Sequence, residues 1–194
     1  GNRLRQEIID GVPVLVLDQV RVEHGPTTIT ANTGRYYRDR GQVEVEGNVR
    51  IVERETTITG QHGTYDVATG IATLTGNVEI RRGDLRIRGP RATYDRAAGI
   101  ARLGGGVQVK DAARDVRADS LVYWTAEDRA MALGRVQIEE AGDRDAVIRG
   151  EVAEYKRREG DLQMLEKASV TFEDEGKPVE ITASDFSFRE QGKV

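Results

Sequence analysis

The sequence contains no cysteine, few aromatic residues and no long apolar run, and these absences exclude several classes of protein. Without cysteine, the chain has no disulfide framework, no thiolate metal site and no cysteine nucleophile. The longest apolar run, residues 12–17, contains a proline and is far shorter than the roughly 18 residues that a membrane-spanning helix needs. Only 5% of the residues are aromatic, and no pair of carboxylates shares a face with an aromatic platform. A carbohydrate-processing β-helix is therefore the weakest of the functional hypotheses.

The chain also lacks the basic surplus of a nucleic-acid binder. Its 194 residues include 29 basic and 33 acidic side chains, interspersed in sign, for a formal charge of −4. We therefore expect no nucleic acid among its partners. The sequence opens at Gly1 with no basic segment, apolar core and cleavage site, so any secretory signal has been removed or was never present.

What the sequence does contain is a repeat with a period of 29 residues. A motif of the form Thr-Ile-Thr followed by glycine and tyrosine occurs at residues 28–36 and again at 57–65. The second half of the unit repeats a segment of the Gly-Asn-Val type, again at intervals of 29 residues. Insertions lengthen the last two units to 32 and 33 residues. The repeated aromatic positions are Tyr36, Tyr65, Tyr94, Tyr123, Tyr155 and Phe188, and the Gly-Asn-Val-type positions begin at Gly47, Gly76, Gly105 and Gly134.

Each unit predicts two β-strands, because apolar and charged residues alternate along it. Residues 43–51 place valine and isoleucine at odd positions and glutamate, asparagine and arginine at even positions, which is the pattern of a strand with one apolar face. Glycine-containing turns at residues 66–70, 82–84 and 95–99 separate the strands. The chain is therefore expected to be all-β, built from about six strand-turn-strand units.

Two local conflicts interrupt this alternation. Ile58 and Tyr65 are seven residues apart and would lie on opposite faces of a straight strand. We place a kink or bulge at Gly60 and Gly63 that returns the tyrosine to the inner face. In the fourth unit Ala132 replaces a leucine, so that strand carries a bulge or its inward face is poorly filled.

A repeat with one apolar face must stack and fold over to bury that face. Two closures satisfy this requirement: two facing sheets forming a sandwich or V-shaped trough, or a right-handed parallel β-helix. Either closure leaves edge strands at the two ends, and such edges are templates for head-to-tail pairing with another chain.

Residues 57–80, including Leu74-Thr75-Gly76-Asn77-Val78, resemble the OstA-like module of bacterial lipopolysaccharide transport. That module is shared by a periplasmic bridge protein, its inner-membrane-anchored partner and the amino-terminal domain of the outer-membrane assembly protein. The resemblance implies an elongated β-jellyroll, described as a V-shaped trough, for which the parallel β-helix is the alternative. It also divides the chain into a lead-in at residues 1–13, one repeat domain at 14–190 and a tail at 191–194.

The resemblance implies a non-catalytic, periplasmic carrier that binds the acyl chains of lipopolysaccharide between two sheets. Its partners would be other OstA-like transport components, docked through edge strands, and further copies of this chain, head to tail. Inward residues usually pack only against each other, so core packing is the competing interpretation for each lining position. The predicted trough-lining residues are Val43, Val45, Val49, Ile51, Ile58, Leu74, Val78, Ile80, Ile87, Leu103, Val107, Val109, Val116, Val136 and Ile138.

The sequence predicts no catalytic residues, no metal site and no cofactor. The two histidines, His24 and His62, are 38 residues apart and have no third ligand at a metal-binding spacing. Arginines are concentrated at residues 81–91, and guanidinium groups suit phosphate oxygens. We favour an ordinary solvated face for that cluster, because acidic residues lie beside it. The two competing functions are the amino-terminal domain of an outer-membrane assembly protein and a ligand-free structural β-rod.

Overall fold

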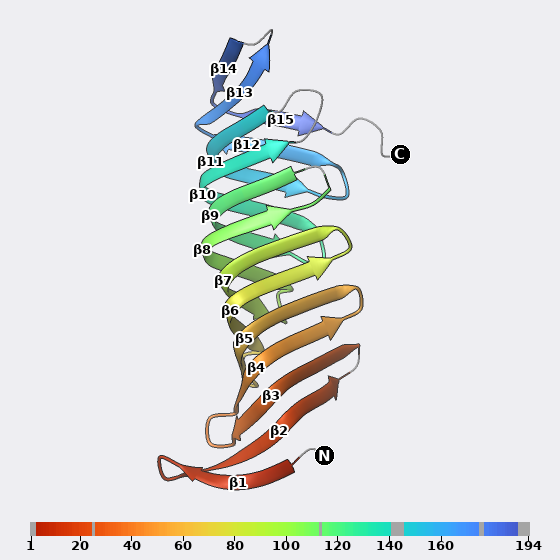
Figure 1. The fold of residues 1–194 in the computed structure, drawn as a ribbon, viewed down its shortest axis with the longest axis vertical. Helices are drawn as coiled ribbons and strands as arrows, with labels where there is room; N and C mark the ends of the chain where they lie inside the picture. Colours follow the sequence, from red (N-terminus) through yellow and green to blue (C-terminus); the bar gives the residue numbers. More distant parts are fainter. Residues whose placement is uncertain (1–2, 25, 113, 141–145, 175–176, 190–194) are drawn as a thin grey trace. The chain divides into compact units, whose positions relative to one another are not determined.

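The computed structural model describes residues 3–24, 26–112, 114–140, 146–174 and 177–189. These residues form strands joined by short turns (Figure 1). The strands are β1 (Arg3–Ile9), β2 (Val12–His24), β3 (Thr27–Tyr37), β4 (Gln42–Glu53), β5 (Thr56–Asp66), β6 (Ile71–Arg82), β7 (Leu85–Asp95), β8 (Ile100–Lys110), β9 (Arg114–Trp124), β10 (Arg129–Glu140), β11 (Ala146–Lys156), β12 (Asp161–Glu166), β13 (Ala168–Asp174), β14 (Lys177–Ala183) and β15 (Phe186–Arg189).

The chain divides into two compact units, which are described separately here. Unit 1 comprises Gly1–Gly83 and Arg88–Ala98, and unit 2 comprises Asp84–Ile87 and Gly99–Val194. In unit 1 the strands from β1 to β6 pair in chain order. In unit 2 the order is β8-β9-β10-β11-β12-β15, while β13 pairs with β11 and β14. Residues 3–9, within the predicted lead-in, form the edge strand β1.

Every pair of neighbouring strands described is antiparallel. The predicted all-β repeat is therefore confirmed, and the alternative of a parallel β-helix is wrong. The physical reason is the length of the connections. Turns of a few residues reverse the chain directly, whereas a parallel pair requires a crossover of a dozen residues or more.

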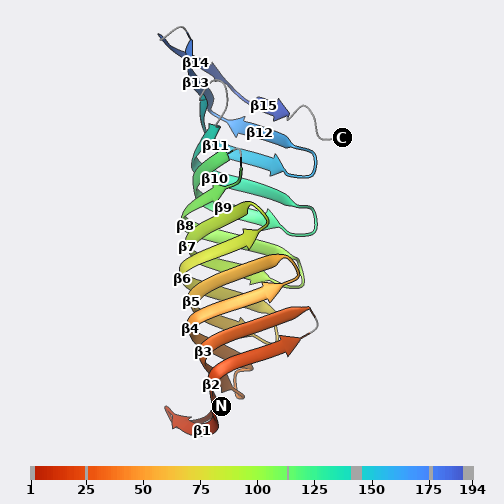
Figure 2. The ribbon, with the colours of Figure 1, turned by 45° about the vertical axis from the view of Figure 1, so that its right-hand side comes forward.

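Strands β4, β6, β8 and β10 carry a β-bulge near the middle, and this bulge bends them. Gly47 and Asn48 in β4 lie between Glu46, which pairs with His62, and Val49, which pairs with Gly60. Two residues of β4 thus oppose one residue of β5, which bends the strand. Figures 1 and 2 show the result in β4–β6 and again in β8–β11, as a front layer of strand segments with a fainter layer behind it.

The bulge lies on the neighbouring strands and not, as the sequence suggested, at Gly60 and Gly63. The backbone φ angle is positive at both residues of the bulge pairs Gly47/Asn48 and Gly76/Asn77, a conformation that glycine and asparagine tolerate best. Gly60 and Gly63 have a different role. A Cβ atom on Gly60 would lie 2.7 Å from Leu74 Cγ, and one on Gly63 would lie 3.1 Å from Leu74 Cδ1. Both glycines therefore make room for Leu74. Between Gly60 and Gly63, the side of β5 that faces the interior switches.

The turns at the ends of the strands are also repeated, and each contacts the next. In unit 1 the amide of Val67 donates to the carbonyl of Gly41 at 2.9 Å, and that of Arg96 donates to Gly70 at 3.3 Å. In unit 2 the amide of Thr125 donates to the carbonyl of Gly99 at 3.0 Å. Gly41, Gly70 and Gly99 all have positive φ, and the last two lie in turns that the sequence predicted. The turns thus continue the hydrogen-bond ladder beyond the strands.

Candidate functional site

The predicted trough-lining residues lie on one face of the strands, in rows that cross from strand to strand. In unit 1, Val45 pairs with Gly63 and Ile51 pairs with Ile58. In unit 2, Val109 pairs with Val116, which in turn pairs with Ile138. We call this side the apolar face. The structure buries Val49, Leu74, Val78, Ile80, Ile87, Leu103, Val107, Val136 and Ile138, and it half-buries Val43, Val45, Ile51, Ile58, Val109 and Val116.

The repeat tyrosines lie in one of these rows. Tyr65 in β5 stands directly opposite Val43 in β4 and Ala72 in β6. In unit 2, Tyr155 stands opposite Ala130 and Leu162. Alternation of a large ring with small or branched neighbours fills the row without overlap. The tyrosines therefore belong to the apolar face.

Unit 1 leaves part of its apolar face half-buried, although Val49, Leu74, Val78 and Ile80 are buried. Val43 and Val45 in β4, and Ile51 and Ile58 in the row beyond the bulge, are all half-buried. The same row continues in β2 to Val22, which is 46% exposed. A half-exposed row of aliphatic side chains has apolar surface that a ligand is able to cover.

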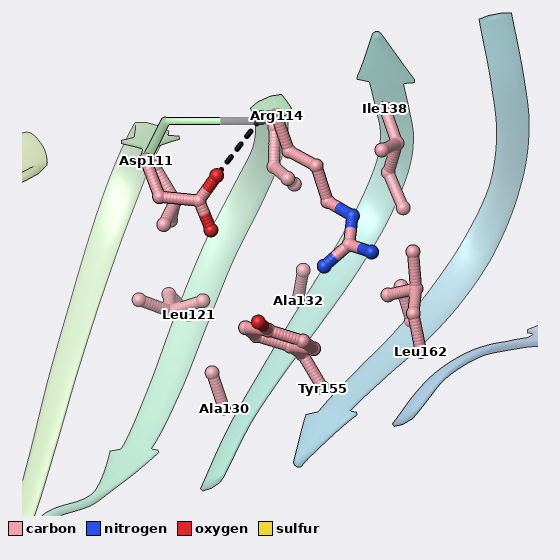
Figure 3. Close-up of a pocket in the computed structure, with 11 residues that line it drawn as sticks. Asp111, Arg114, Leu121, Ala130, Ala132, Ile138, Tyr155 and Leu162 are labelled. Atoms are coloured by element: carbon pink, nitrogen blue, oxygen red, sulfur yellow. Dashed lines mark hydrogen bonds between the residues drawn. The ribbon is translucent and has the colours of Figure 1, made fainter. Parts of the chain in front are cut away.

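Unit 2 covers most of its apolar face, although Val109 and Val116 stay half-buried. Ile138 and Ile148, which pair with each other, are 0% and 1% exposed. A cavity of about 40 Å³ remains among strands β8 to β12 (Figure 3). This space holds a few water-sized groups but not an acyl chain. Its lining consists of Val109, Asp111, Arg114, Val116, Leu121, Ala130, Ala132, Ile138, Ala153, Tyr155 and Leu162.

The cavity lies beside Ala132, which occupies a position that holds a larger residue in the preceding repeats. Ala132 stands where β8 has Leu103 and is 5% exposed. The usual bulge is present in β10, at Gly134 and Arg135. The sequence left two alternatives for the fourth unit, a bulge or a poorly filled inward face. The bulge recurs in other units, so the poorly filled inward face is what distinguishes the fourth unit.

One charged side chain enters this apolar interior. Arg114 is 8% exposed, and its guanidinium carbon lies 5.1 Å from the centre of the Tyr155 ring. Its backbone amide donates to the carboxylate of Asp111 at 2.8 Å. Figure 3 shows the Arg114 side chain extending from its strand into the cavity toward Tyr155. A guanidinium over an aromatic face is a favourable cation–π arrangement.

Several residues of the unit 2 interior were missed by the sequence analysis. Ile148, Leu162 and Met164 are at most 3% exposed and lie beyond the insertions that break the 29-residue period. Restarting the repeat from Tyr155 identifies them, because Ile148, Leu162 and Met164 have the same spacing from Tyr155 as Ile58, Ala72 and Leu74 have from Tyr65. Leu162 also faces Tyr155 directly. The 29-residue period did not predict these positions, because insertions lengthen the repeat there.

The described residues contain no group of three or more histidine, cysteine, aspartate or glutamate side chains arranged to hold a metal ion. Within those residues there is also no helix of the length and hydropathy needed to cross a membrane.

Comparison with known proteins identifies the family. The model of the family described as "LptA/(LptD N-terminal domain) LPS transport protein" matches residues 57–191. Among solved structures, LptH of Pseudomonas aeruginosa is similar to this chain with a TM-score of 0.55 and 15% identity, over 60% of this chain and 96% of that one. LptH is described as the LptA-homologous periplasmic component of a conserved lipopolysaccharide transport device. A search of curated proteins found no match. The family match spans most of the sequence, and the chain therefore belongs to the LptA/LptD amino-terminal-domain family of lipopolysaccharide transport proteins.

Proposed function

We propose that this chain is a non-catalytic, periplasmic lipid-binding bridge that carries lipopolysaccharide toward the outer membrane. The acyl chains would lie on the apolar face of unit 1. The observation that carries the proposal is the half-exposed set of aliphatic residues there, including Val43, Val45, Ile51 and Ile58, in a member of a lipopolysaccharide transport family.

The binding energy would come from burying acyl chains. Each methylene group removed from water contributes about 0.8 kcal/mol, so a few buried methylenes per chain are enough for measurable affinity. Covering the half-exposed aliphatic residues adds to this sum. No covalent step is required, which agrees with a carrier and with the absence of predicted catalytic residues.

Unit 2 must open if it is to bind an acyl chain as well. Its trough-lining positions Val107, Val136 and Ile138 are at most 4% exposed, and its cavity of about 40 Å³ is too small. We propose that its residues serve as a packed core in the ligand-free protein and become lipid contacts only if the two layers separate. The fifteen predicted residues would therefore contact lipid directly in unit 1 and only after opening in unit 2.

The experiment is photo-crosslinking with lipopolysaccharide. A photoreactive residue at Val45, on the apolar face, is expected to form a lipid adduct, and one at the neighbouring Glu44, on the opposite face, is not. Equal labelling at both positions, or none at Val45, would contradict the proposal. The same probe at Val107 tests unit 2 separately, where an adduct requires opening.

We further propose docking to other OstA-like components and to copies of this chain through edge strands. Among the described strands β1 pairs only with β2, and its Leu4 and Ile8 are 66% and 68% exposed. An unpaired strand edge with apolar residues is a template for pairing. Removing residues 1–9 is expected to abolish head-to-tail association, measured by analytical ultracentrifugation.

A ligand-free structural role is the second candidate, and the packed interior of unit 2 favours it. The crosslinking experiment separates the two functions, because a structural rod takes up no lipid at Val45. Distinguishing a free bridge from the amino-terminal domain of an outer-membrane assembly protein requires the full-length gene product, since the matched family includes both.

A further inference from the structure

A hollow on the charged face of unit 1 has the composition of an anion site. The hollow measures about 260 Å³ and is lined by Arg50, Thr57, Thr59, Glu79 and Arg81. These residues come from three successive strands, β4, β5 and β6. The hollow lies on the face opposite to the proposed lipid contacts, since the lining positions alternate with Ile51, Ile58 and Ile80.

The register of the strands brings these side chains together. Thr59 stands directly opposite Arg50 on β4 and Glu79 on β6. Thr57 stands directly opposite Arg81. Residues directly opposite in a sheet have Cβ atoms about 4.5–5.5 Å apart. Two guanidinium groups therefore flank two threonine hydroxyls across a short distance.

The charges in and around the hollow do not cancel. The carboxylate of Glu79 accepts hydrogen bonds from Arg81 and, at 2.6 Å, from Nε of Arg88. One negative charge is thus shared by two arginines. Arg50 forms no ion pair within the part of the chain that the structure describes. The group of three arginines and one glutamate has a net charge of +2.

Glu79 keeps this arrangement in place over a wide pH range. Burial of the carboxyl acts to raise its pKa, but the hydrogen bonds and charges of Arg81 and Arg88 outweigh burial and lower the pKa of Glu79. The carboxylate is therefore ionised at neutral pH and holds the guanidinium group of Arg81 at the hollow. A bound anion then meets one arginine that is already positioned.

We infer that this hollow binds a phosphate group, either a free phosphate or a phosphate monoester on a sugar. Guanidinium groups of arginine pair with phosphate oxygens through two parallel hydrogen bonds. The hydroxyls of Thr57 and Thr59 are further donors to those oxygens. A dianion matches the net charge of +2, whereas a single carboxylate leaves one charge uncompensated. The site does not depend on acyl chains in the interior.

The test is an NMR titration of the full chain with inorganic phosphate at low salt, followed through the backbone amides of residues 57 and 59. Arg50→Gln removes the guanidinium that has no ion pair among the described residues and is expected to weaken binding about tenfold, corresponding to about 1.4 kcal/mol. Arg38→Gln, an exposed arginine in a turn of the same unit, is the matched control and is expected to have no effect.

Equal weakening by Arg50→Gln and Arg38→Gln would overturn the site in favour of nonspecific attraction, as would an unchanged affinity in Arg50→Gln. Folding of each variant is checked in the same amide spectra. A parallel titration with glucose 6-phosphate separates the two sources of phosphate. Tighter, Arg50-dependent binding of the sugar phosphate indicates a headgroup site, and equal affinity indicates a site for phosphate alone. Because neither probe has an acyl chain, failure here leaves the crosslinking result at Val45 unaffected.

Discussion

The two units are made from the same repeat, yet one pair of matched positions on their apolar faces differs in how far it is covered. Ile51 in unit 1 and Ile138 in unit 2 occupy equivalent positions three repeats apart and pair with Ile58 and Ile148 respectively. Ile51 and Ile58 are half-buried, whereas Ile138 and Ile148 are 0% and 1% exposed. The alternation of residues thus determines which face is apolar. The residues packed over that face determine whether it is a core or an open surface.

The largest expected effect comes from truncating the matched isoleucines. Ile138→Ala removes a fully buried side chain and leaves a cavity, so we expect the free energy of unfolding to fall by about 3–4 kcal/mol. Ile51→Ala, at the half-buried position, is expected to cost about 1–2 kcal/mol, because less surface returns to water. Urea unfolding of both variants measures the difference. Equal losses would mean that the units are packed alike.

The bulge glycines should show no difference between the units. Gly76 in unit 1 and Gly134 in unit 2 have φ angles of +81° and +75°. An added Cβ atom would lie 2.5 Å from Gln61 Cβ and 2.6 Å from Asp119 Oδ2 respectively. Replacing either glycine by alanine is therefore expected to destabilise the protein by about 1–3 kcal/mol.

Thermal unfolding followed by circular dichroism tests this second prediction. Gly104→Ala is the control, since a Cβ atom there would have no neighbour within 4 Å and Gly104 does not have a positive φ angle. If Gly134→Ala were tolerated while Gly76→Ala was not, the bend would be essential in unit 1 alone.

Much of this fold was predictable from the sequence, because one 29-residue pattern is repeated with little change. The strands, the turns and the apolar side at Val43, Val49 and Leu74 followed from alternation and glycine positions. The position of the bend did not. It depends on pairing between strands, and the two glycines that drew attention, Gly60 and Gly63, make space for Leu74 from the adjacent strand.

The candidate site was predictable only as a list of inward positions. Alternation cannot separate Ile51 from Ile138, since the two have identical local patterns and differ only in what covers them. The hollow near Arg50 was missed for a related reason. The sequence drew attention to a linear cluster of arginines at residues 81–91, whereas the hollow combines Arg50 and Arg81 with threonines of the strand between them.

Filling the cavity of unit 2 should improve the packing of that unit and stabilise the protein. Ala132→Val adds two methyl groups beside the cavity of about 40 Å³, and we expect the free energy of unfolding to rise by about 0.5–1 kcal/mol. Differential scanning calorimetry measures the change. Ala126→Val, in an exposed turn, is the matched control and should change little. A destabilised Ala132→Val variant would show that the cavity walls do not accommodate the larger side chain.

The smallest effect concerns pH and the charged faces of the two units. Glu79 in unit 1 corresponds to Gln108 in unit 2, one repeat later. The folded-state pKa of Glu79 is lowered, so its contribution to stability is present above the pKa of the unfolded chain and is lost as the pH falls through the folded value. Glu79→Gln places in unit 1 the residue that unit 2 has at the equivalent position. The substitution removes this dependence of stability on pH. Urea unfolding between pH 6 and pH 3 should therefore show a difference of about 1 kcal/mol or less between wild type and variant that shrinks as the solution becomes acidic. A constant difference across that range would assign the stabilisation to the shape of the side chain and not to its charge.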